Sequence, residues 1–531
     1  MGFDPTQAVR GAIGNTLGDA LHRSVCRQPQ APALYFQGRD WSYAQLDVGA
    51  NRVARGLLDA GLVQGDRVAA YGKNSDAYVL LWLGCVRAGL IHVPVNYALV
   101  RDELAYICNQ SGAAALFCDD DLMANVEALG DTVDLRLRGS LRAEKAHART
   151  EALDILSLAL STAGGTGNDT PPPVDIGDDD PVQILYTSGT TSAPKGAVHT
   201  YRSLFAEYIG CLLHLDVAEH DRCLAALPLY HSAQMHCFLM PGLLRGAFNY
   251  LIESPQADRV LEIIETEGIT SFFAPPTVWI GLLRHDDFDR RDLASLRKLY
   301  YGASIMPEPI VAELARRLPE GRLFNCYGQS EIAPLATVLA PEEHVADRLS
   351  SCGRPITTVQ TRIVRPGTLE DCAPGEHGEI VHRSPQLMVA YWDKPEQTAE
   401  AFEGGWFHSG DLAYRDDEGF IYIVDRIKDV VNTGGVMVAS REVEEALYTH
   451  PAIAEIAVIG VPHAKWVEAI AAVVVLKPGS TASAEELIAH ARERLAAFKL
   501  PKAVHFVDEL PKNTAGKLLK RELRTRFSDE K

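Results

Sequence analysis

A hydroxyl-rich segment with one lysine, residues 186–196, carries the residue types that bind polyphosphate. It reads Tyr-Thr-Ser-Gly-Thr-Thr-Ser-Ala-Pro-Lys-Gly and follows an apolar stretch that is typical of a strand. Hydroxyls, backbone N–H groups beside a flexible glycine, and an ammonium can converge on phosphate oxygens. It is not a Walker loop, because Pro194 precedes Lys195 where that motif has glycine, and Gly196 follows it where that motif has Ser or Thr. A Ser/Thr-rich hairpin turn is the alternative interpretation.

Three further segments place single charged residues in loops. Glu331 ends the segment 325–331 after a candidate strand at 322–324, and a carboxylate there suits Mg²⁺, which prefers carboxylate and phosphate oxygens. Asp411, in Gly-Trp-Phe-His-Ser-Gly-Asp-Leu, can accept hydrogen bonds from both hydroxyls of a ribose. Lys517 follows a glycine near the C-terminus, where a loop lysine can reach a distant site. The alternatives are a solvated loop carboxylate, a turn aspartate and a solvated basic tail.

The elements that must position these loops alternate between helix and strand. Residues 41–61 carry apolar side chains at a spacing of three to four and predict an amphipathic helix. Strands are predicted at 67–71 and 92–95, with an apolar helix between them, which favours a parallel α/β layer. The Gly, Pro and Asp-rich stretch 163–181 predicts a linker or long loop, after which the pattern resumes with a strand at 182–186.

The last third of the chain has a different pattern. Short β-like runs broken by glycine and proline predict a small β-barrel-like part at about residues 341–427. The helices and strands predicted beyond it are at 441–448, 456–460, 469–476 and 484–495. We therefore predict an α/β multidomain protein, with a large N-terminal domain of α/β subdomains at residues 1–427 and a small α+β C-terminal domain at residues 428–531.

Composition excludes several classes of protein. The 51 basic and 70 acidic residues give a formal net charge of −19, which disfavours non-specific binding to nucleic acid. The longest apolar run, residues 78–86, is too short to cross a bilayer, and the start of the chain has no apolar signal core, so we expect a cytoplasmic protein. The ten cysteines form no C-x-x-C pair, so we expect reduced thiols and no structural zinc.

The order of the charged segments resembles that of the adenylate-forming superfamily, which includes acyl-CoA synthetases, peptide-synthetase adenylation domains and firefly luciferase. The matching motifs are TSGTTSAPKG, YGQSE, GWFHSGDL, DRIKD and NTAGK, and the match covers about residues 41–521. Within the family the chain looks most like bacterial fatty-acyl-CoA synthetases. The resemblance implies a ligase that makes acyl-AMP and pyrophosphate from a carboxylic acid and ATP, then transfers the acyl group to CoA. It also implies a mobile C-terminal domain with a hinge at Lys428.

The resemblance implies roles for individual residues and three cofactors, ATP, Mg²⁺ and CoA. The implied ATP and AMP contacts are Thr187, Ser188, Gly189, Thr190, Thr191, Lys195, Gly302, Ala303, Tyr327, Gly328, Ser330, Asp411 and Arg426. Glu331 would bind Mg²⁺, and Lys517 would bridge the acyl carboxylate and the α-phosphate. Lys195 and Ser330 join these two as candidate catalytic residues. Gly434 and Gly435 would lie beside the pantetheine part of CoA.

The acid to be activated is expected to contact residues 228–242, which contain no Asp, Glu, Lys or Arg. An amino-acid substrate is therefore disfavoured, because its buried ammonium would have no partner. His231, Gln234, Met235 and Phe238 are the predicted acyl pocket, although several of them could instead pack in the core.

We predict a medium- to long-chain fatty acid as the substrate. An aryl acid, transfer of the acyl group to a carrier protein, and a catalytically weak nucleotide-binding relative are the alternatives, with luciferase-like oxidation a weaker one. Both Glu331 and Lys517 are present, which argues against the inactive alternative. We expect small-molecule partners, no nucleic acid and no membrane segment, and leave open whether the chain is a homodimer.

Overall fold

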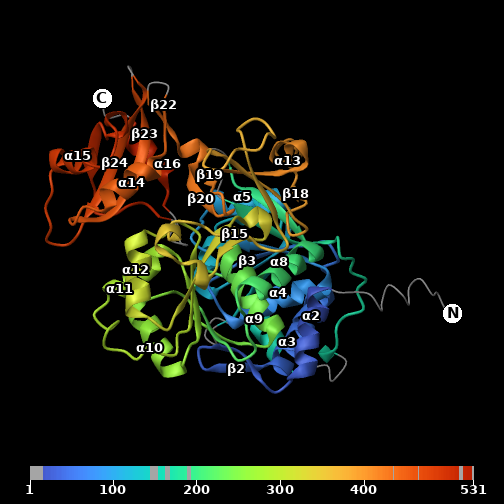
Figure 1. Ribbon diagram of the computed structural model, residues 1–531. Helices are drawn as coiled ribbons and strands as arrows, with labels where there is room; N and C mark the ends of the chain where they lie inside the picture. The colour runs from blue at the N-terminus through green and yellow to red at the C-terminus, as the bar shows by residue number, and fades with distance from the viewer. Residues whose placement is uncertain are drawn as a thin grey trace.

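The computed structural model describes residues 16–143, 153–161, 168–187, 193–433, 436–463, 466–512 and 518–528. Among these residues the strands form several sheets with helices packed on their faces, as Figure 1 shows. The elements labelled α14, α15, α16, β22, β23 and β24 in Figure 1 gather in a lobe of their own beside the larger N-terminal lobe. The predicted architecture, a large α/β part followed by a small α+β C-terminal part, is confirmed.

A largely parallel sheet forms one half of the N-terminal lobe, in the order β18-β8-β7-β4-β3-β5-β6. Its strands are β3 (Arg67–Tyr71), β4 (Ile91–Val95), β5 (Ala113–Cys118), β6 (Leu137–Ser140), β7 (Pro181–Thr187), β8 (Lys195–Thr200) and β18 (Ala390–Tyr391). Strands β3 to β7 pair in parallel, whereas β8 is antiparallel to both β7 and β18. The β7–β8 hairpin brings the two ends of the predicted phosphate loop together; residues 188–192 of that loop lie outside the described part.

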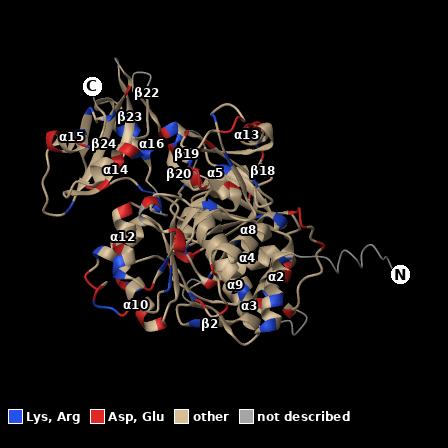
Figure 2. Ribbon diagram, in the orientation of Figure 1, with Lys and Arg blue, Asp and Glu red and all other residues tan. Residues whose placement is uncertain are grey.

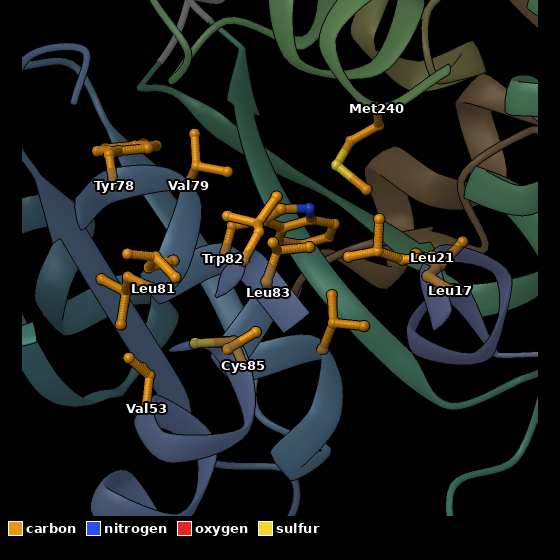
Figure 3. Packing of buried hydrophobic residues seen from close by; sticks show 14 of the residues in the cluster. Leu17, Leu21, Val53, Tyr78, Val79, Leu81, Trp82, Leu83, Cys85 and Met240 are labelled. Carbon is orange, nitrogen blue, oxygen red and sulfur yellow. The ribbon is translucent and has the colours of Figure 1, made fainter. Parts of the chain in front are cut away.

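Helix α4 (Asp76–Ala88) is buried along its whole length, because apolar residues surround its axis between the charged residues at its two ends. It packs against α3 (Tyr43–Asp59) and lies near α2 (Leu17–Arg27). Figure 3 shows Trp82 of α4 at the centre of this core, with Met240 pointing toward it from a distant part of the chain. Helix α3 begins at Tyr43 rather than at the predicted residue 41, because Ser42 caps it: the Ser42 hydroxyl accepts from the Gln45 N–H at 3.2 Å.

A second mixed sheet forms the other half of the lobe, in the order β15-β14-β13-β12-β11-β9-β10-β1-β2. Its strands are β1 (Pro32–Phe36), β2 (Arg39–Ser42), β9 (Arg222–Ala225), β10 (Phe248–Leu251), β11 (Ser271–Ala274), β12 (Lys298–Gly302), β13 (Arg322–Gly328), β14 (Leu335–Leu339) and β15 (Arg354–Pro355). Gly302 is required where β12 meets β13, since an added Cβ would lie 2.1 Å from the carbonyl oxygen of Cys326.

Helices pack on the faces of these sheets. They are α5 (Asp102–Ser111), α6 (Met123–Glu127), α7 (Ile155–Leu160), α8 (Tyr201–His214), a π-helix η4 (Ala233–Leu239), α9 (Met240–Arg245), α10 (Ala257–Glu267), α11 (Pro276–Arg284), α12 (Glu308–Arg317) and α13 (Pro395–Ala401). Figure 2 shows acidic and basic residues together on α10 and α12. No helix in the described ranges is long and apolar enough to span a bilayer.

The predicted β-barrel-like part is an open antiparallel sheet rather than a barrel. Its order is β16 (Gln360–Val364), β17 (Gly378–Arg383), β19 (Phe407–Arg415) and β20 (Ile421–Arg426). The outer edge of β20 bonds instead to the segment after β14: the Ile421 N–H donates to Gly353 O, and the Cys352 N–H donates to Ile421 O, each at 2.9 Å. This edge is therefore occupied by the neighbouring sheet.

The C-terminal lobe is an α+β unit that follows a short turn, η9 (Ile427–Asp429). Its strands are β21 (Val431–Thr433), β22 (Val436–Val438), β23 (Ile453–His463), β24 (Val467–Leu476) and β25 (Ala503–Phe506), and its helices are α14 (Ser440–Tyr448), α15 (Ala484–Arg492) and α16 (Lys520–Phe527). Because β23 and β24 pair along nearly their full length, both extend beyond the predicted strands. The domain boundary at 427 and 428 stays a prediction.

The predicted linker is attached to the N-terminal lobe in its described part. Arg52 of α3 forms an ion pair with Asp169 at 2.7 Å, and the Asn51 amide donates to the Asp169 carbonyl oxygen at 2.7 Å. Residues 168–180 therefore form a long loop fixed on α3, while 162–167 lie outside the described residues.

Candidate active site

A cavity of about 2510 Å³ lies between the two lobes and is lined by residues of both. The predicted site residues on its wall are Thr187, Lys195, His231, Phe238, Ala303, Tyr327, Gly328, Ser330, Glu331, Asp411, Arg426 and Lys428. They come from strand ends and loops that are far apart in the chain. The fold therefore brings together most of the described residues that the resemblance assigned to ATP binding.

One end of this wall carries a carboxylate beside hydroxyls and an ammonium. Oε1 of Glu331 accepts from the Thr187 hydroxyl at 3.3 Å and from the Tyr391 phenol at 3.0 Å. Nζ of Lys195 lies over the Tyr391 ring, 4.2 Å from its centroid. A hard carboxylate oxygen on the cavity wall, with a lysine nearby, has the donor chemistry that fits a Mg²⁺–triphosphate pair.

A second group of side chains converges on Asp411, at the β19–β20 end of the cavity. Oδ2 of Asp411 accepts from the Tyr327 phenol at 2.6 Å and from the Gln329 amide at 2.7 Å. Nε of Arg426 lies 2.6 Å from Oδ1. Burial and then the Asp411 charge raise the pKa of Tyr327 well above its ordinary value, so its hydroxyl stays a donor. The carboxylate is thus held in a fixed orientation.

Ser330 is fixed between two neighbours. Its hydroxyl lies 3.0 Å from the Ser232 hydroxyl, and its carbonyl oxygen lies 2.7 Å from Nε2 of His199. That nitrogen must carry a proton, because a carbonyl only accepts. Burial lowers the pKa of His199 to about 4, with the Ser330 carbonyl opposing this in part, so the imidazole is neutral at pH 7.

The remaining predicted nucleotide contacts occupy tight backbone positions. Ala303 follows β12 with a φ of 63°, a conformation that side-chain-bearing residues rarely adopt. An added Cβ on Gly328 would lie 1.7 Å from the Pro334 carbonyl oxygen. Only glycine therefore permits the turn that presents Ser330 and Glu331 to the cavity.

The acyl side of the cavity is lined by aromatic rings. Phe238, on the π-helix η4, stacks on Phe273 at the end of β11, with ring centroids 4.3 Å apart and an angle of 16° between the planes. Phe238 also contacts Tyr300, with centroids 5.0 Å apart. Behind these rings lies a separate void of only about 10 Å³. The aromatic rings therefore close this side of the cavity.

The predicted acyl-pocket residues divide into two groups. His231 and Phe238 line the cavity. Met235 does not, because it is fully buried in the core that contains Trp82. Gln234 is also turned inward: its side-chain oxygen accepts from the Leu227 N–H at 3.2 Å. On a helix, successive residues point in different directions, so one segment supplies both cavity wall and core.

A buried carboxylate anchors this π-helix from behind. Oε1 of Glu207 accepts from the Cys211 thiol at 3.3 Å, the Cys237 thiol at 3.4 Å and the Leu335 N–H at 3.0 Å. The Gln386 amide donates to its other oxygen at 2.7 Å. Desolvation raises the pKa of Glu207 to about 8, although the Leu335 N–H and the two thiols oppose the shift.

The joint between the lobes is polar. Asp425, at the end of β20, accepts from the Ser440 N–H at 2.6 Å and from the Ser440 hydroxyl at 2.7 Å, so it caps the N-terminus of α14. Arg524 of α16 forms an ion pair with Asp429 at 2.7 Å. Lys428 lies in this joint, on the cavity wall. Its role as a hinge stays a prediction.

Several predicted site residues lie outside the described part of the chain. They are Ser188, Gly189, Thr190, Thr191, Gly434, Gly435 and Lys517. Sequence reasoning also missed three residues that contact the predicted ones: Gln329, His199 and Tyr391. Gln329 could have been found, because it lies inside the YGQSE motif. His199 and Tyr391 carry no local signal, since their contacts join segments 131 and 60 residues apart.

Comparison with known proteins accounts for this arrangement. Residues 21–392 match the AMP-binding enzyme family, and residues 442–517 match the AMP-binding enzyme C-terminal domain. The chain is 38% identical to a feruloyl-CoA synthase from Amycolatopsis sp. over 96% of this chain and 99% of that protein. It is 34% identical to a long-chain-fatty-acid–CoA ligase of Bacillus subtilis (strain 168), over 96% and 94%.

A solved structure shows the same architecture. ATP-bound MatB from Rhodopseudomonas palustris superposes with a TM-score of 0.87 at 28% identity, covering 96% of this chain and 99% of that one. These matches confirm the resemblance drawn from the motifs. The chain belongs to the AMP-binding enzyme family and is an ATP-binding, AMP-forming acid–CoA ligase.

Proposed function

We propose that the protein activates a compact aromatic carboxylic acid, of the benzoate or arylpropenoate type, and joins it to CoA. The observation that carries this proposal is the stacked pair Phe238 and Phe273, which closes the acyl side of the cavity. Flat rings favour offset stacking with a flat acid, worth about 0.5–1.5 kcal/mol beyond burial. The void of about 10 Å³ behind them offers no room for a long alkyl chain in that direction.

The relatives support an aromatic acid as well. The name of the Amycolatopsis relative states that it forms feruloyl-CoA, the thioester of a hydroxylated arylpropenoate.

The carboxylate of the acid is already ionised at pH 7, so the first step needs no general base. The difficulty of this step is to bring the carboxylate anion close to the negatively charged triphosphate.

In the proposed first step, side chains of the cavity bind ATP and the acid. Lys195 and the hydroxyls of residues 187–191 bind the β- and γ-phosphates, Asp411 binds the ribose, and Ser330 contacts the α-phosphate. Lys517 bridges the acyl carboxylate and the α-phosphate. Glu331 binds Mg²⁺, whose chemistry is to neutralise phosphate charge.

In the proposed second step, the CoA thiol attacks acyl-AMP and AMP leaves. The C-terminal lobe swivels about Lys428 between the two steps, and the glycines at 434 and 435 lie beside the pantetheine arm. The polar character of the joint at Asp425 supports such a motion, because contacts between domains that move relative to each other are more polar than permanent ones.

A medium-chain fatty acid is the second candidate. It is favoured by apolar residues on the same wall, such as Ile280 and Pro276, and by the likeness to the fatty-acid ligase of B. subtilis. Its alkyl chain would have to follow the cavity away from Phe238 rather than pass behind it.

One substrate screen distinguishes these acids. Pyrophosphate release and thioester mass would be measured with benzoate, cinnamate, coumarate, ferulate, octanoate, palmitate and phenylalanine. We expect the best kcat/KM for an aromatic acid and none for phenylalanine. If palmitate were the best substrate, the aromatic assignment would be wrong.

A pair of variants locates the acid. Phe238→Leu shortens the closing wall, so activity with octanoate should rise relative to cinnamate. Met235→Leu is the matched control, because it changes a core side chain of similar volume and should leave the ratio unchanged. An unchanged ratio in Phe238→Leu would place the acid elsewhere.

A further inference from the structure

Tyr391 lies between two oppositely charged side chains of the cavity, Lys195 and Glu331. The ammonium of Lys195 sits over the face of its ring, 4.2 Å from the centroid. Its hydroxyl donates to Oε1 of Glu331 at 3.0 Å. A single side chain therefore contacts both charges that the proposed function assigns to the triphosphate and to Mg²⁺.

The backbone holds Tyr391 in place. Strand β18 pairs with β8, so Tyr391 lies opposite Ala197, and its N–H donates to the Thr398 hydroxyl at 3.0 Å. Tyr391 is 6% exposed. Because a carboxylate oxygen only accepts, the phenol is the donor in its hydrogen bond to Glu331.

In an enzyme without bound nucleotide, the opposite charges of Lys195 and Glu331 attract each other. An ammonium and a carboxylate that share a cavity tend to pair directly, because water screens them poorly there. In the described part of the chain no ion pair joins these two residues; each contacts Tyr391 instead. The ring face attracts the cation, while the hydroxyl at its edge bonds the anion.

We propose that Tyr391 is a positioning residue that keeps Lys195 and Glu331 apart. The ammonium then remains available for phosphate oxygens, and the carboxylate remains available for Mg²⁺. The inference rests on the proposed function, because the roles of Lys195 and Glu331 are part of it.

Two variants separate the two contacts of Tyr391. Tyr391→Phe keeps the ring under Lys195 and removes the donor to Glu331. Tyr391→Leu removes both. Binding of ATP would be measured by calorimetry on the full chain, over a series of Mg²⁺ concentrations and in EDTA, with no acid or CoA present. The readout is binding, so it does not depend on turnover.

We expect Tyr391→Phe to raise the Mg²⁺ concentration for half-maximal ATP binding by about tenfold, as for loss of a hydrogen bond to a charged group. Its ATP affinity in EDTA should remain within about twofold of that of the unmodified chain, because the contact between ring and lysine is kept. Tyr391→Leu should weaken ATP binding in EDTA as well, by about fivefold, since Lys195 then pairs with Glu331.

Tyr43→Phe is the matched control for loss of a buried tyrosine hydroxyl. That hydroxyl donates to the Ala247 carbonyl oxygen at 2.8 Å, and Tyr43 is not on the cavity wall. The variant Tyr43→Phe should lower thermal stability and leave the Mg²⁺ concentration for half-maximal ATP binding unchanged. If Tyr391→Phe behaved in the same way, Tyr391 would be structural and the inference would be wrong.

The outcome also separates this inference from the proposed substrate. Should no aromatic acid be activated while Tyr391→Phe shifts the Mg²⁺ dependence, the substrate assignment fails and the role of Tyr391 stands. An unmodified chain that binds ATP equally with and without Mg²⁺ would overturn the role of Tyr391 together with that of Glu331.

Discussion

The two walls of the cavity are built in different ways. On the N-terminal wall, Asp411 and Ser330 are each held by several hydrogen bonds from neighbouring strands. The contacts described across the joint to the C-terminal lobe are polar and centre on Asp425 and Asp429. A wall whose side chains are held by hydrogen bonds from several segments suits the proposed nucleotide site, whereas a joint made of a few polar contacts suits the proposed change in position of the C-terminal lobe.

The lobes also differ in their exposed apolar surface. The tips of β22 and β24 in the C-terminal lobe expose Val436, Met437 and Val467 by 45%, 60% and 64%. Val467 in addition has a φ of 68°, which is strained for a β-branched residue. This strain lies in the lobe that is expected to move, and it suggests that the tip is shaped for another surface rather than for its own stability.

The largest effect that we expect is a difference between the two lobes in their stability at low pH. Burial lowers the pKa of His92 and His382 to about 3 and that of His199 to about 4, all in the N-terminal lobe. In the unfolded chain these histidines take up protons near pH 6.5, whereas in the folded protein they stay neutral to a lower pH. The free energy of unfolding therefore falls as the pH drops below about 6.5. The loss is about 1.4 kcal/mol per histidine and pH unit, until the pKa in the folded protein is reached.

We therefore expect the N-terminal lobe to unfold first as the pH falls from 7.5 to 4.5. Hydrogen–deuterium exchange, resolved by peptide, would measure both lobes in one sample. Earlier loss of protection in the C-terminal lobe would contradict the assignment of the fixed wall to the N-terminal side.

Lys517→Ala tests the C-terminal wall. If Lys517 stabilises charge only during adenylation, the variant should slow acyl-AMP formation by about 10²–10³-fold, as for loss of a preorganised electrostatic contact. Thioester formation from supplied acyl-AMP should persist. Lys477→Ala, on the surface of the same lobe, is the control. Equal losses in both steps would argue against a lobe that changes position.

Asp411→Asn tests the N-terminal wall. It leaves Arg426 without its charged partner and weakens the hydrogen bond from Tyr327, so ATP affinity should fall by about tenfold or more. In the proposed mechanism the nucleotide stays on this wall, so both half-reactions should suffer. The control Asp179→Asn changes an exposed carboxylate that pairs with Arg202. A loss confined to the first step would count against a ribose role.

Lys428→Pro tests the joint itself. Proline fixes φ and removes the backbone N–H, so the swivel should be hindered. With the lobe held in one pose, one half-reaction should continue while the other slows. We expect the ratio of the two rates to change by about tenfold. ATP–pyrophosphate exchange and thioester formation would be assayed separately, with Lys428→Ala as the control. A proline variant that kept the normal ratio of the two rates would remove the hinge from position 428.

Val467→Gly should have the smallest effect, an increase in the stability of the C-terminal lobe. Glycine adopts positive φ without strain, so the C-terminal lobe should become more stable by about 1 kcal/mol, within the cost of a strained backbone position. Thermal unfolding of the full chain, followed by exchange in β23 and β24, would measure it. A loss of stability would show that packing of the valine outweighs the strain.

The sequence alone determined the family and the order of the motifs, and it predicted the chemistry of the site. Strands at 67–71 and 182–186, and helices in the C-terminal lobe, followed from periodicity, because apolar spacing records which face is buried. Lys195, Glu331 and Asp411 could be named because each lies in a short local motif.

Tertiary structure decided how those residues are held. Met235 and Phe238 belong to one apolar segment, yet one packs in the core and the other faces the cavity, because the π-helix sets their directions and sequence does not reveal it. The place of Tyr391 between Lys195 and Glu331 depends on strand β18 joining β8 across almost 200 residues. Such pairings arise from the packing of distant segments, so a local pattern could predict the charges but not the side chain that keeps them apart.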